Sequence, residues 1–251
     1  MKKYLIFLIP LMMGFSNAWG EISIQNDRQY FGNDGALHIV GEIQNDLNAP
    51  VNQVIVYVTL FSNGQILDTK STSSFVNTIM PGMKGPFDLV ILGDQSKSVD
   101  EYTLDVNFKV ADPKSQVIDI TYSEFLRDEF DNLAIMGTVT NRGEITANTV
   151  VVVATLYDRD GKVAAVSKAH TEPDYLQSND ESFFLISVPD KIQSQLIVDY
   201  SLVAESEEYA AVPEFPLGSM VLLASSVSAY IILTRYSGRL ITNLVSAANP
   251  K

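Results

Sequence analysis

The chain matches itself when it is shifted so that Leu37 lies on Leu133. Apolar residues, glycines and asparagines stay in the same order along the match. The matched pairs are Ile22/Ile118, Ile24/Ile120, Leu37/Leu133, Ile39/Ile135, Gly41/Gly137, Asn45/Asn141, Asn52/Asn148, Val54/Val150, Val56/Val152, Val58/Ala154, Leu60/Leu156 and, after one inserted residue, Gly64/Gly161 and Phe87/Phe184. Self-similarity of this kind predicts repeated structural units. We therefore expect two similar domains, at residues 19–111 and 112–204.

Both copies have the residue pattern of β-strands. Apolar and polar residues alternate over 37–43, and the runs 54–61 and 150–157 are rich in β-branched and aromatic residues. Turn residues follow at 62–64 and 158–161, where Asn, Asp and Gly accept the backbone angles of a hairpin. A single sheet would leave one apolar face in water, so we predict an all-β fold of two tandem β-sandwich domains.

Composition narrows the possible functions. The hydrophobic fraction of 46% indicates a folded chain, and the absence of cysteine excludes disulfides, thiolate nucleophiles and cysteine-bound zinc. The net charge of −13 would repel phosphate backbones, so we expect no nucleic-acid partner. The charged stretch 123–132 is the place where we expect a helical turn on the surface.

The N-terminus has the features of a secretory signal peptide at residues 1–18. Lys2 and Lys3 precede an apolar run from Tyr4 to Phe15, and small residues at Ser16 and Ala18 occupy the positions that signal peptidase reads. We therefore expect export, and removal of these residues from the mature protein.

A second apolar run, 217–234, is just long enough to cross a bilayer as a helix. Arg235 and Arg239 follow it, and basic residues stay on the cytoplasmic side. We expect a polar linker at 205–216, a transmembrane helix at 217–234 and a cytoplasmic tail at 235–251. The protein would then be a single-pass protein of the cell membrane with its domains on the extracellular side.

The repeated motifs resemble the FxLYD-type domain. They are Val58-Thr59-Leu60-Phe61 before Gly64, Ala154-Thr155-Leu156-Tyr157-Asp158 before Gly161, the strands Gly41–Asn45 and Gly137–Asn141, and Pro81-Gly82 before Phe87. Two positions depart from the family pattern: Ser178-Asn179 replaces Pro-Gly in the second copy, and Ser62 replaces the expected aspartate in the first. The resemblance covers most of 21–204 and implies immunoglobulin-like sandwiches of an extracellular protein without known catalysis.

The segment Val212-Pro213-Glu214-Phe215-Pro216, followed by an apolar run and arginines, is similar to the Pro-Glu-Phe tail of archaeal surface proteins. The resemblance implies that the tail is a sorting signal for an archaeosortase-type enzyme, which would remove the helix. A proline-capped entry into a membrane helix that is retained is the alternative.

No residue set predicts catalysis, a cofactor or a metal site. The two histidines, His38 and His170, fall short of the three or four ligands that metal sites usually need, and His38 is placed on the outward face of its strand. No nucleophile elbow, phosphate loop or dinucleotide fingerprint occurs. We therefore expect a protein that is not an enzyme and has no cofactor.

Two acidic segments resemble parts of calcium sites. In the stretch 158–161 turn chemistry explains the residues, because Lys162 and Val163 break the calcium-loop pattern. Glu124 with the acidic residues of 128–131 (Asp128, Glu129 and Asp131) is the better candidate, near the expected domain junction. A solvated acidic loop is the more common meaning of such a cluster.

Two functional hypotheses remain. The first is a non-enzymatic surface protein for adhesion, envelope structure or binding of other envelope proteins. The second is an accessory or binding subunit of a membrane enzyme or transporter. A large uncharged patch on one sheet would indicate docking on a partner, whereas an evenly acidic surface would indicate a spacer.

Overall fold

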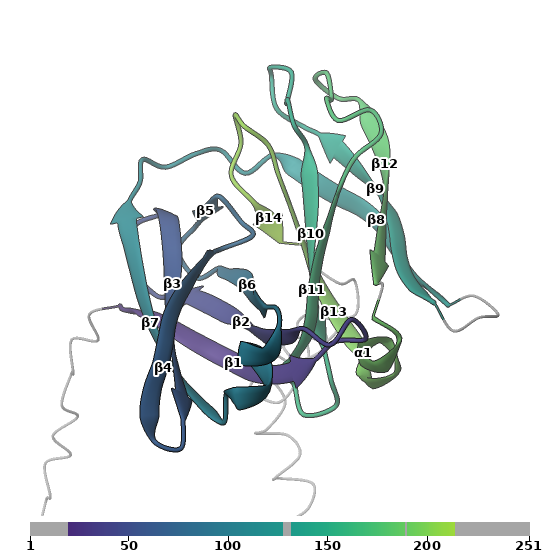
Figure 1. Ribbon diagram of the computed structural model, residues 1–251. Helices are drawn as coiled ribbons and strands as arrows, with labels where there is room; N and C mark the ends of the chain where they lie inside the picture. The colour runs from purple at the N-terminus through teal and green to yellow at the C-terminus, as the bar shows by residue number, and fades with distance from the viewer. Residues whose placement is uncertain (1–19, 128–131, 189, 214–251) are drawn as a thin grey trace, which may run out of the picture.

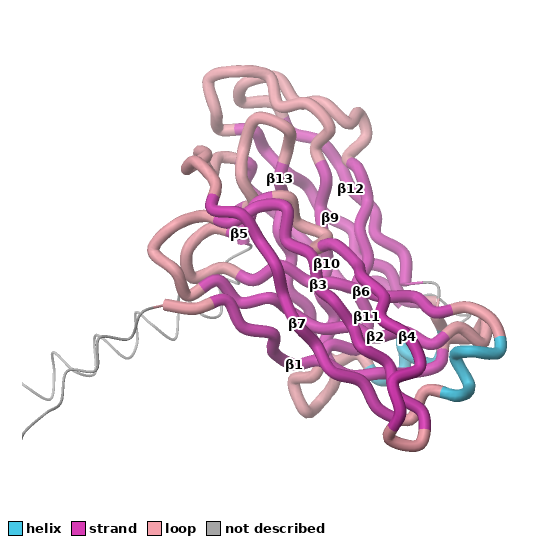
Figure 2. The backbone as a smooth tube through the Cα atoms, turned by 60° about the vertical axis from the view of Figure 1, so that its left-hand side comes forward, coloured by secondary structure: helices cyan, strands magenta, loops and turns pink. Residues whose placement is uncertain are grey.

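The computed structural model describes residues 20–127, 132–188 and 190–213. These residues form an all-β body of four antiparallel sheets, with helical residues at one end (Figures 1 and 2). We name residues 20–111 the first unit and residues 112–213 the second unit.

The two units contain similar successions of elements, although β5 and β14 have no equivalent strand in the other unit and a 3-10 helix of the first unit stands where the second has an α-helix. The first unit has β1 (Ile22–Phe31), β2 (Leu37–Asn45), β3 (Val51–Ser62), β4 (Gln65–Ser73), β5 (Thr78–Ile79), β6 (Lys84–Ile91), the 3-10 helix η1 (Asp94–Ser98) and β7 (Glu101–Val110). The second has β8 (Ile118–Arg127), β9 (Leu133–Asn141), β10 (Val151–Tyr157), β11 (Val163–His170), β12 (Glu181–Val188), α1 (Lys191–Leu196), β13 (Asp199–Glu205) and β14 (Val212–Pro213).

In each unit two sheets enclose an apolar core. Sheet β1-β2-β6 of the first unit faces β3, which pairs with β4, β5 and β7. Sheet β8-β9-β12 of the second unit faces sheet β11-β10-β13-β14. Leu60 and Leu156, the predicted matching core positions, are both 0% exposed. The structure thus confirms an all-β, sandwich-like protein.

A close glycine–phenylalanine contact recurs in both units. Gly41 lies opposite Phe87 on the neighbouring strand, and Gly137 lies opposite Phe184. A Cβ atom on Gly41 would come within 2.8 Å of the Phe87 ring, and one on Gly137 within 2.6 Å of the Phe184 ring. Glycine at these two positions therefore makes room for the largest fully buried side chain of each unit.

The second copy has Ser178-Asn179 in place of Pro-Gly, yet it forms the same turn as the first copy. Asn45 and Asn141 end equivalent strands, and their carbonyl oxygens accept hydrogen bonds from the N–H groups of Gly82 and Asn179, each at 2.7 Å. Gly82 has φ +76° and Asn179 has φ +64°. Asparagine tolerates this left-handed backbone better than other residues with a side chain, which explains how it replaces glycine here.

The helical turn expected within 123–132 is not found over 123–127, because these residues belong to strand β8. Ser123 and Phe125 point into the core, where Ser123 Oγ lies 2.8 Å from Tyr200 Oη and Phe125 packs edge-on to the same ring. The alternating apolar positions of the strand outweigh the charges that suggested a surface turn. Residues 128–131 lie outside the described residues.

The two units pack together through sheets that are not equivalent. Strand β11 of the second unit contacts β1, β2 and β6 of the first unit, and Figure 2 shows β2, β6, β10 and β11 together in the middle of the body. An apolar cluster seals this junction. Its buried members come from both units: Val76, Val153, Val203 and Ala211. The junction therefore joins the outer face of β1-β2-β6 to the outer face of β10-β11-β13.

The first residues of the expected linker are part of the folded second unit. Glu205 ends β13, and β14 pairs with β13 through Val203↔Pro213 and Ala204↔Val212. Tyr209, Ala210 and Ala211 are at most 8% exposed. Apolar side chains among the acidic residues explain the difference, because they are buried as the chain turns back to pair β14 with β13. The body therefore extends to Pro213.

Among the described residues no helix has the length and apolar character of a membrane span. The expected signal peptide at 1–18, transmembrane helix at 217–234 and tail at 235–251 lie outside the described residues.

Candidate functional site

The outer face of sheet β8-β9-β12 forms no junction with another part of the described chain. We call it the free face. Cross-strand register places these residues on it: Asp119, Tyr122, Glu124 and Leu126 of β8, Ala134, Met136, Thr138 and Thr140 of β9, and Glu181, Phe183, Leu185 and Ser187 of β12. Residues between them, such as Ile135 and Phe184, point into the core. The alternation of the strands produces the face.

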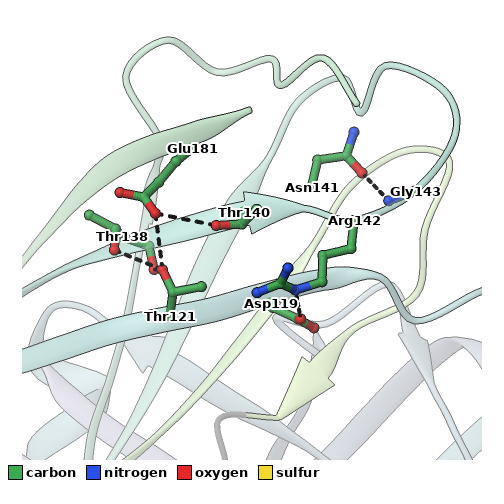
Figure 3. Close-up of polar contacts among 8 residues, drawn as sticks. All are labelled: Asp119, Thr121, Thr138, Thr140, Asn141, Arg142, Gly143 and Glu181. Atoms are coloured by element: carbon green, nitrogen blue, oxygen red, sulfur yellow. Dashed lines mark hydrogen bonds and ion pairs between the residues drawn. The ribbon is translucent and has the colours of Figure 1, made fainter. Parts of the chain in front are cut away.

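Hydroxyl groups and one carboxylate hold the polar end of the free face together (Figure 3). Thr121 Oγ1 and Thr138 Oγ1 lie 2.9 Å apart, and Glu181 Oε2 accepts from Thr140 Oγ1 at 3.4 Å and Thr121 Oγ1 at 3.5 Å. A shift in register after Ile120 brings Thr121 into this group. The contacts connect three strands and leave the Glu181 carboxylate in solvent.

Two further contacts in Figure 3 stabilise the strand ends. Arg142 Nε donates to Asp119 Oδ2 at 2.5 Å in a pair whose side chains are 58% and 39% exposed, and an exposed pair contributes about 0–1 kcal/mol. Gly143 N–H donates to Asn141 Oδ1 at 2.8 Å, as Leu47 N–H does to Asn45 Oδ1 in the first unit. The recurrence shows that the asparagine contact belongs to the fold.

The middle of the free face is apolar and exposed. Tyr122 is 48% exposed, Phe183 42% and Leu185 48%. Phe183 lies opposite Thr138, and Leu185 lies opposite the partly exposed Met136. These side chains are close neighbours on one sheet, so they form one patch rather than scattered apolar residues. A contiguous exposed apolar patch on a soluble body is typical of a protein-binding surface.

The equivalent face of the first unit is buried in the junction. Val40 and Glu42 of β2 correspond to Met136 and Thr138 of β9, and they are 0% and 1% exposed. The Glu42 carboxylate accepts hydrogen bonds from Lys84 Nζ at 2.8 Å and from Tyr157 Oη of the second unit at 2.5 Å. Burial, followed by the charge of Glu42, raises the pKa of the Tyr157 hydroxyl, so this donor keeps its proton.

A second polar contact between the units lies at the α1 end. Arg28 donates to Asp158 Oδ2 and to Gln193 Oε1, each at 2.7 Å. Asp190 accepts from the N–H of Asn33 at 2.8 Å and caps α1 by accepting from Gln193 N–H at 2.9 Å. Asp158 and Asp190 thus accept hydrogen bonds within their own local segments and also from residues of the first unit.

A cleft of about 300 Å³ opens between the units beside these contacts. The rings of Tyr30 and His38, whose centroids are 4.9 Å apart, stack on its wall, and Val166 and Val188 of the second unit also line it. Asp88 accepts from His38 Nδ1 at 3.0 Å, and this hydrogen bond raises the pKa of His38. The sequence placed His38 on an outward face but carried no signal that a second unit covers that face.

The other residues considered from the sequence stay apart from one another. His170 is exposed at the end of β11, and Glu124 is exposed on β8. Asp158 Oδ1 accepts from the N–H groups of Asp160 and Lys162 at 2.9 Å each, which is turn chemistry. Asp128, Glu129 and Asp131 lie outside the described residues. Within residues 20–127, 132–188 and 190–213 no three acidic or histidine side chains converge as metal ligands.

Comparisons with known proteins assign no family. No protein-family description matches the chain, and no curated protein matches it. Among solved structures, the exo-chitosanase CsxA of Amycolatopsis orientalis aligns with 76% of this chain at 10% identity and a TM-score of 0.28. Red sea bream transglutaminase aligns with 78% at 10% identity and a TM-score of 0.23. The alignments span 26% and 31% of those two chains, so this chain matches less than a third of either.

Proposed function

We propose that the protein is a non-enzymatic cell-surface protein that binds another envelope protein through the free face. The single observation that carries this proposal is the exposed apolar patch of Tyr122, Phe183 and Leu185 on a chain with net charge −13. Exposed apolar area destabilises the free protein in water unless a partner covers it. A spacer would instead carry polar and acidic residues across the middle of this face as well as at its ends.

The finer fold and the address are part of the same proposal. Each unit is an immunoglobulin-like sandwich of the FxLYD type, exported by the signal peptide at 1–18 and held at the membrane by the tail after Pro213. The tail either stays as a transmembrane helix or is exchanged for another anchor by an archaeosortase-type enzyme. An accessory subunit of a membrane enzyme or transporter is the second candidate, and its partner would occupy the same free face.

The free face can be tested by two paired substitutions. We expect the double variant Phe183→Ser, Leu185→Ser to lose the proteins that cross-link to the wild-type chain in its native membrane, because it removes the apolar contact area. The matched control is Tyr57→Ser, which removes a 39% exposed ring from the outer face of the first unit. Recovery of the same partners by both variants would contradict the proposed role of the free face.

The address has its own test. A chain that ends after Pro213 keeps β14 and should appear outside the cell in the aqueous fraction, with residues 1–18 removed. The full chain should sediment with membranes. If the shortened chain also sediments, the tail is not the anchor.

A further inference from the structure

Glu205 ends β13 of the second unit, yet its side chain reaches into the first unit. The residue is 1% exposed. The N–H group of Asn77, in the segment before β5, donates to Glu205 Oε1 at 3.0 Å and to Oε2 at 3.1 Å. Val76, which precedes Asn77, and Val203, two residues before Glu205, belong to the apolar cluster that seals the junction. The carboxyl group therefore lies where the two units meet.

Two cations face Glu205, and both are engaged elsewhere. Lys114, on the connector between the units, donates from Nζ to the carbonyl oxygen of Glu207 at 2.8 Å. Lys168 of β11 lies over the ring of Phe75 at 5.4 Å. The neighbouring strands β5, β10 and β14 carry no acidic or basic residue. Within the described part of the chain, Glu205 thus has backbone donors but no close counter-ion of its own.

The effect of burial on the pKa of Glu205 is larger than the effect of these contacts. Burial raises the pKa of Glu205 to about 7 from an ordinary value of 4.5, while the backbone N–H donors and the two lysines act in the opposite direction. In a separated pair of units the carboxyl would meet water and regain an ordinary pKa. The proton therefore binds more tightly when the junction is closed.

We propose that the Glu205 carboxyl is a protonation-dependent latch, which holds the two units together most firmly when it carries a proton. The contribution of the carboxyl to closure of the junction is fully present below about pH 4.5, where the group is protonated in both the closed and the open junction. It decreases as the pH rises towards about 7, by up to about tenfold per pH unit in the ratio of closed to open junction. Above that range both states are ionised and the ratio stays constant.

Hydrogen exchange at the Asn77 amide tests the latch, because this amide exchanges only when its bond to Glu205 opens. The full chain in detergent micelles is followed by NMR from about pH 5 to about pH 8, with rates corrected for intrinsic exchange. We expect protection of Asn77 to fall steeply up to about pH 7. In Glu205→Gln, which keeps the shape and an acceptor oxygen, protection should not depend on pH.

Two controls separate Glu205 from other titrating groups. Glu208→Gln changes a carboxylate that bonds Asn148 within the second unit, and it should keep the wild-type dependence. His38→Asn changes a titrating group whose partner, Asp88, lies in the same unit, and it should also keep the wild-type dependence. Protection of the Ile135 amide in β9 verifies that each variant is folded. A pH-independent wild type, or an unchanged dependence in Glu205→Gln, would overturn the latch. Either result leaves the proposed role of the free face untouched.

Discussion

Strands β2 and β9 occupy the same place in the two units, but they are covered differently. Buried and half-buried residues alternate along β9, whereas β2 is buried on both faces from Ile39 to Ile43. The reverse holds for the opposite sheets. β10 is buried from Val151 to Leu156, while its counterpart β3 alternates. Equivalent strands therefore share their inward residues and differ in what lies against their outward residues.

This difference shows that the duplication did not produce a symmetric pair. In an arrangement with two-fold symmetry, the same face of each unit would meet its copy. Here the outer face of β1-β2-β6 meets the outer face of β10-β11-β13, so each unit keeps a different outer face open. The open face of the first unit carries Thr59 and Asp105 around Tyr57, and the free face carries the apolar patch. The open face of the first unit also carries the apolar side chains of Ile55, Phe61 and the 69% exposed Ile66.

The inward residues should behave alike in both units. Leu60→Ala and Leu156→Ala each leave a cavity at a fully buried position, and each should lower the free energy of unfolding by about 2–5 kcal/mol. Urea unfolding of the two variants measures the loss. If one substitution has no effect, the two positions are not equivalent core sites.

The outward residues should behave differently. Val153 of β10 is 1% exposed in the junction cluster, and its counterpart Tyr57 of β3 is 39% exposed. Val153→Asp would bury a polar group without a partner and should cost about 2–4 kcal/mol. Tyr57→Asp should change stability by less than about 0.5 kcal/mol. Equal losses in thermal unfolding would contradict the expectation that burial in the junction makes Val153 the more costly position.

The stability of the first unit should also respond to the protonation of His38, because His38 and its partner Asp88 both belong to that unit. The hydrogen bond to Asp88 raises the pKa of His38 above its ordinary 6.5, so the folded state favours the charged ring. Its contribution to stability is full below about pH 6.5 and is lost as the pH rises through the raised value. Urea unfolding at about pH 6 and about pH 9 should show a smaller difference for His38→Asn than for the wild type. An unchanged difference would exclude His38 as its source.

A small effect on stability is also expected on the free face. Phe183→Ser with Leu185→Ser removes exposed side chains and should shift the free energy of unfolding by no more than about 0.5 kcal/mol per substitution. Calorimetry of the purified variant checks this. A large loss would show that the patch supports the fold itself, and the binding experiment would then need another variant.

The sequence by itself determined the elements that depend on local chemistry. Three such features appear in the structure: the period of two in 37–43, the hairpin turns ending at Gly64 and Gly161, and the repeated pair of glycine and phenylalanine. The residues that set them lie within one strand or turn, or recur in both copies. The same reasoning missed strand β8 at 123–127 and the packed residues 209–211. In both segments apolar side chains stand among charged residues, and they become buried only by packing against residues that are distant in the sequence.

Only the tertiary structure decided which outer faces are covered. The continuous apolar run Val150–Ala154 is consistent with a strand buried on both sides, yet nothing near it in the chain indicates that Val40 and Glu42 lie on the covering face. Glu205 shows the same limit, because it stands in a run of acidic residues and is buried where its carboxylate meets the Asn77 N–H group of the first unit. Burial of an outward side chain depends on how two folded surfaces fit together, and that fit is a property of many residues far apart in sequence.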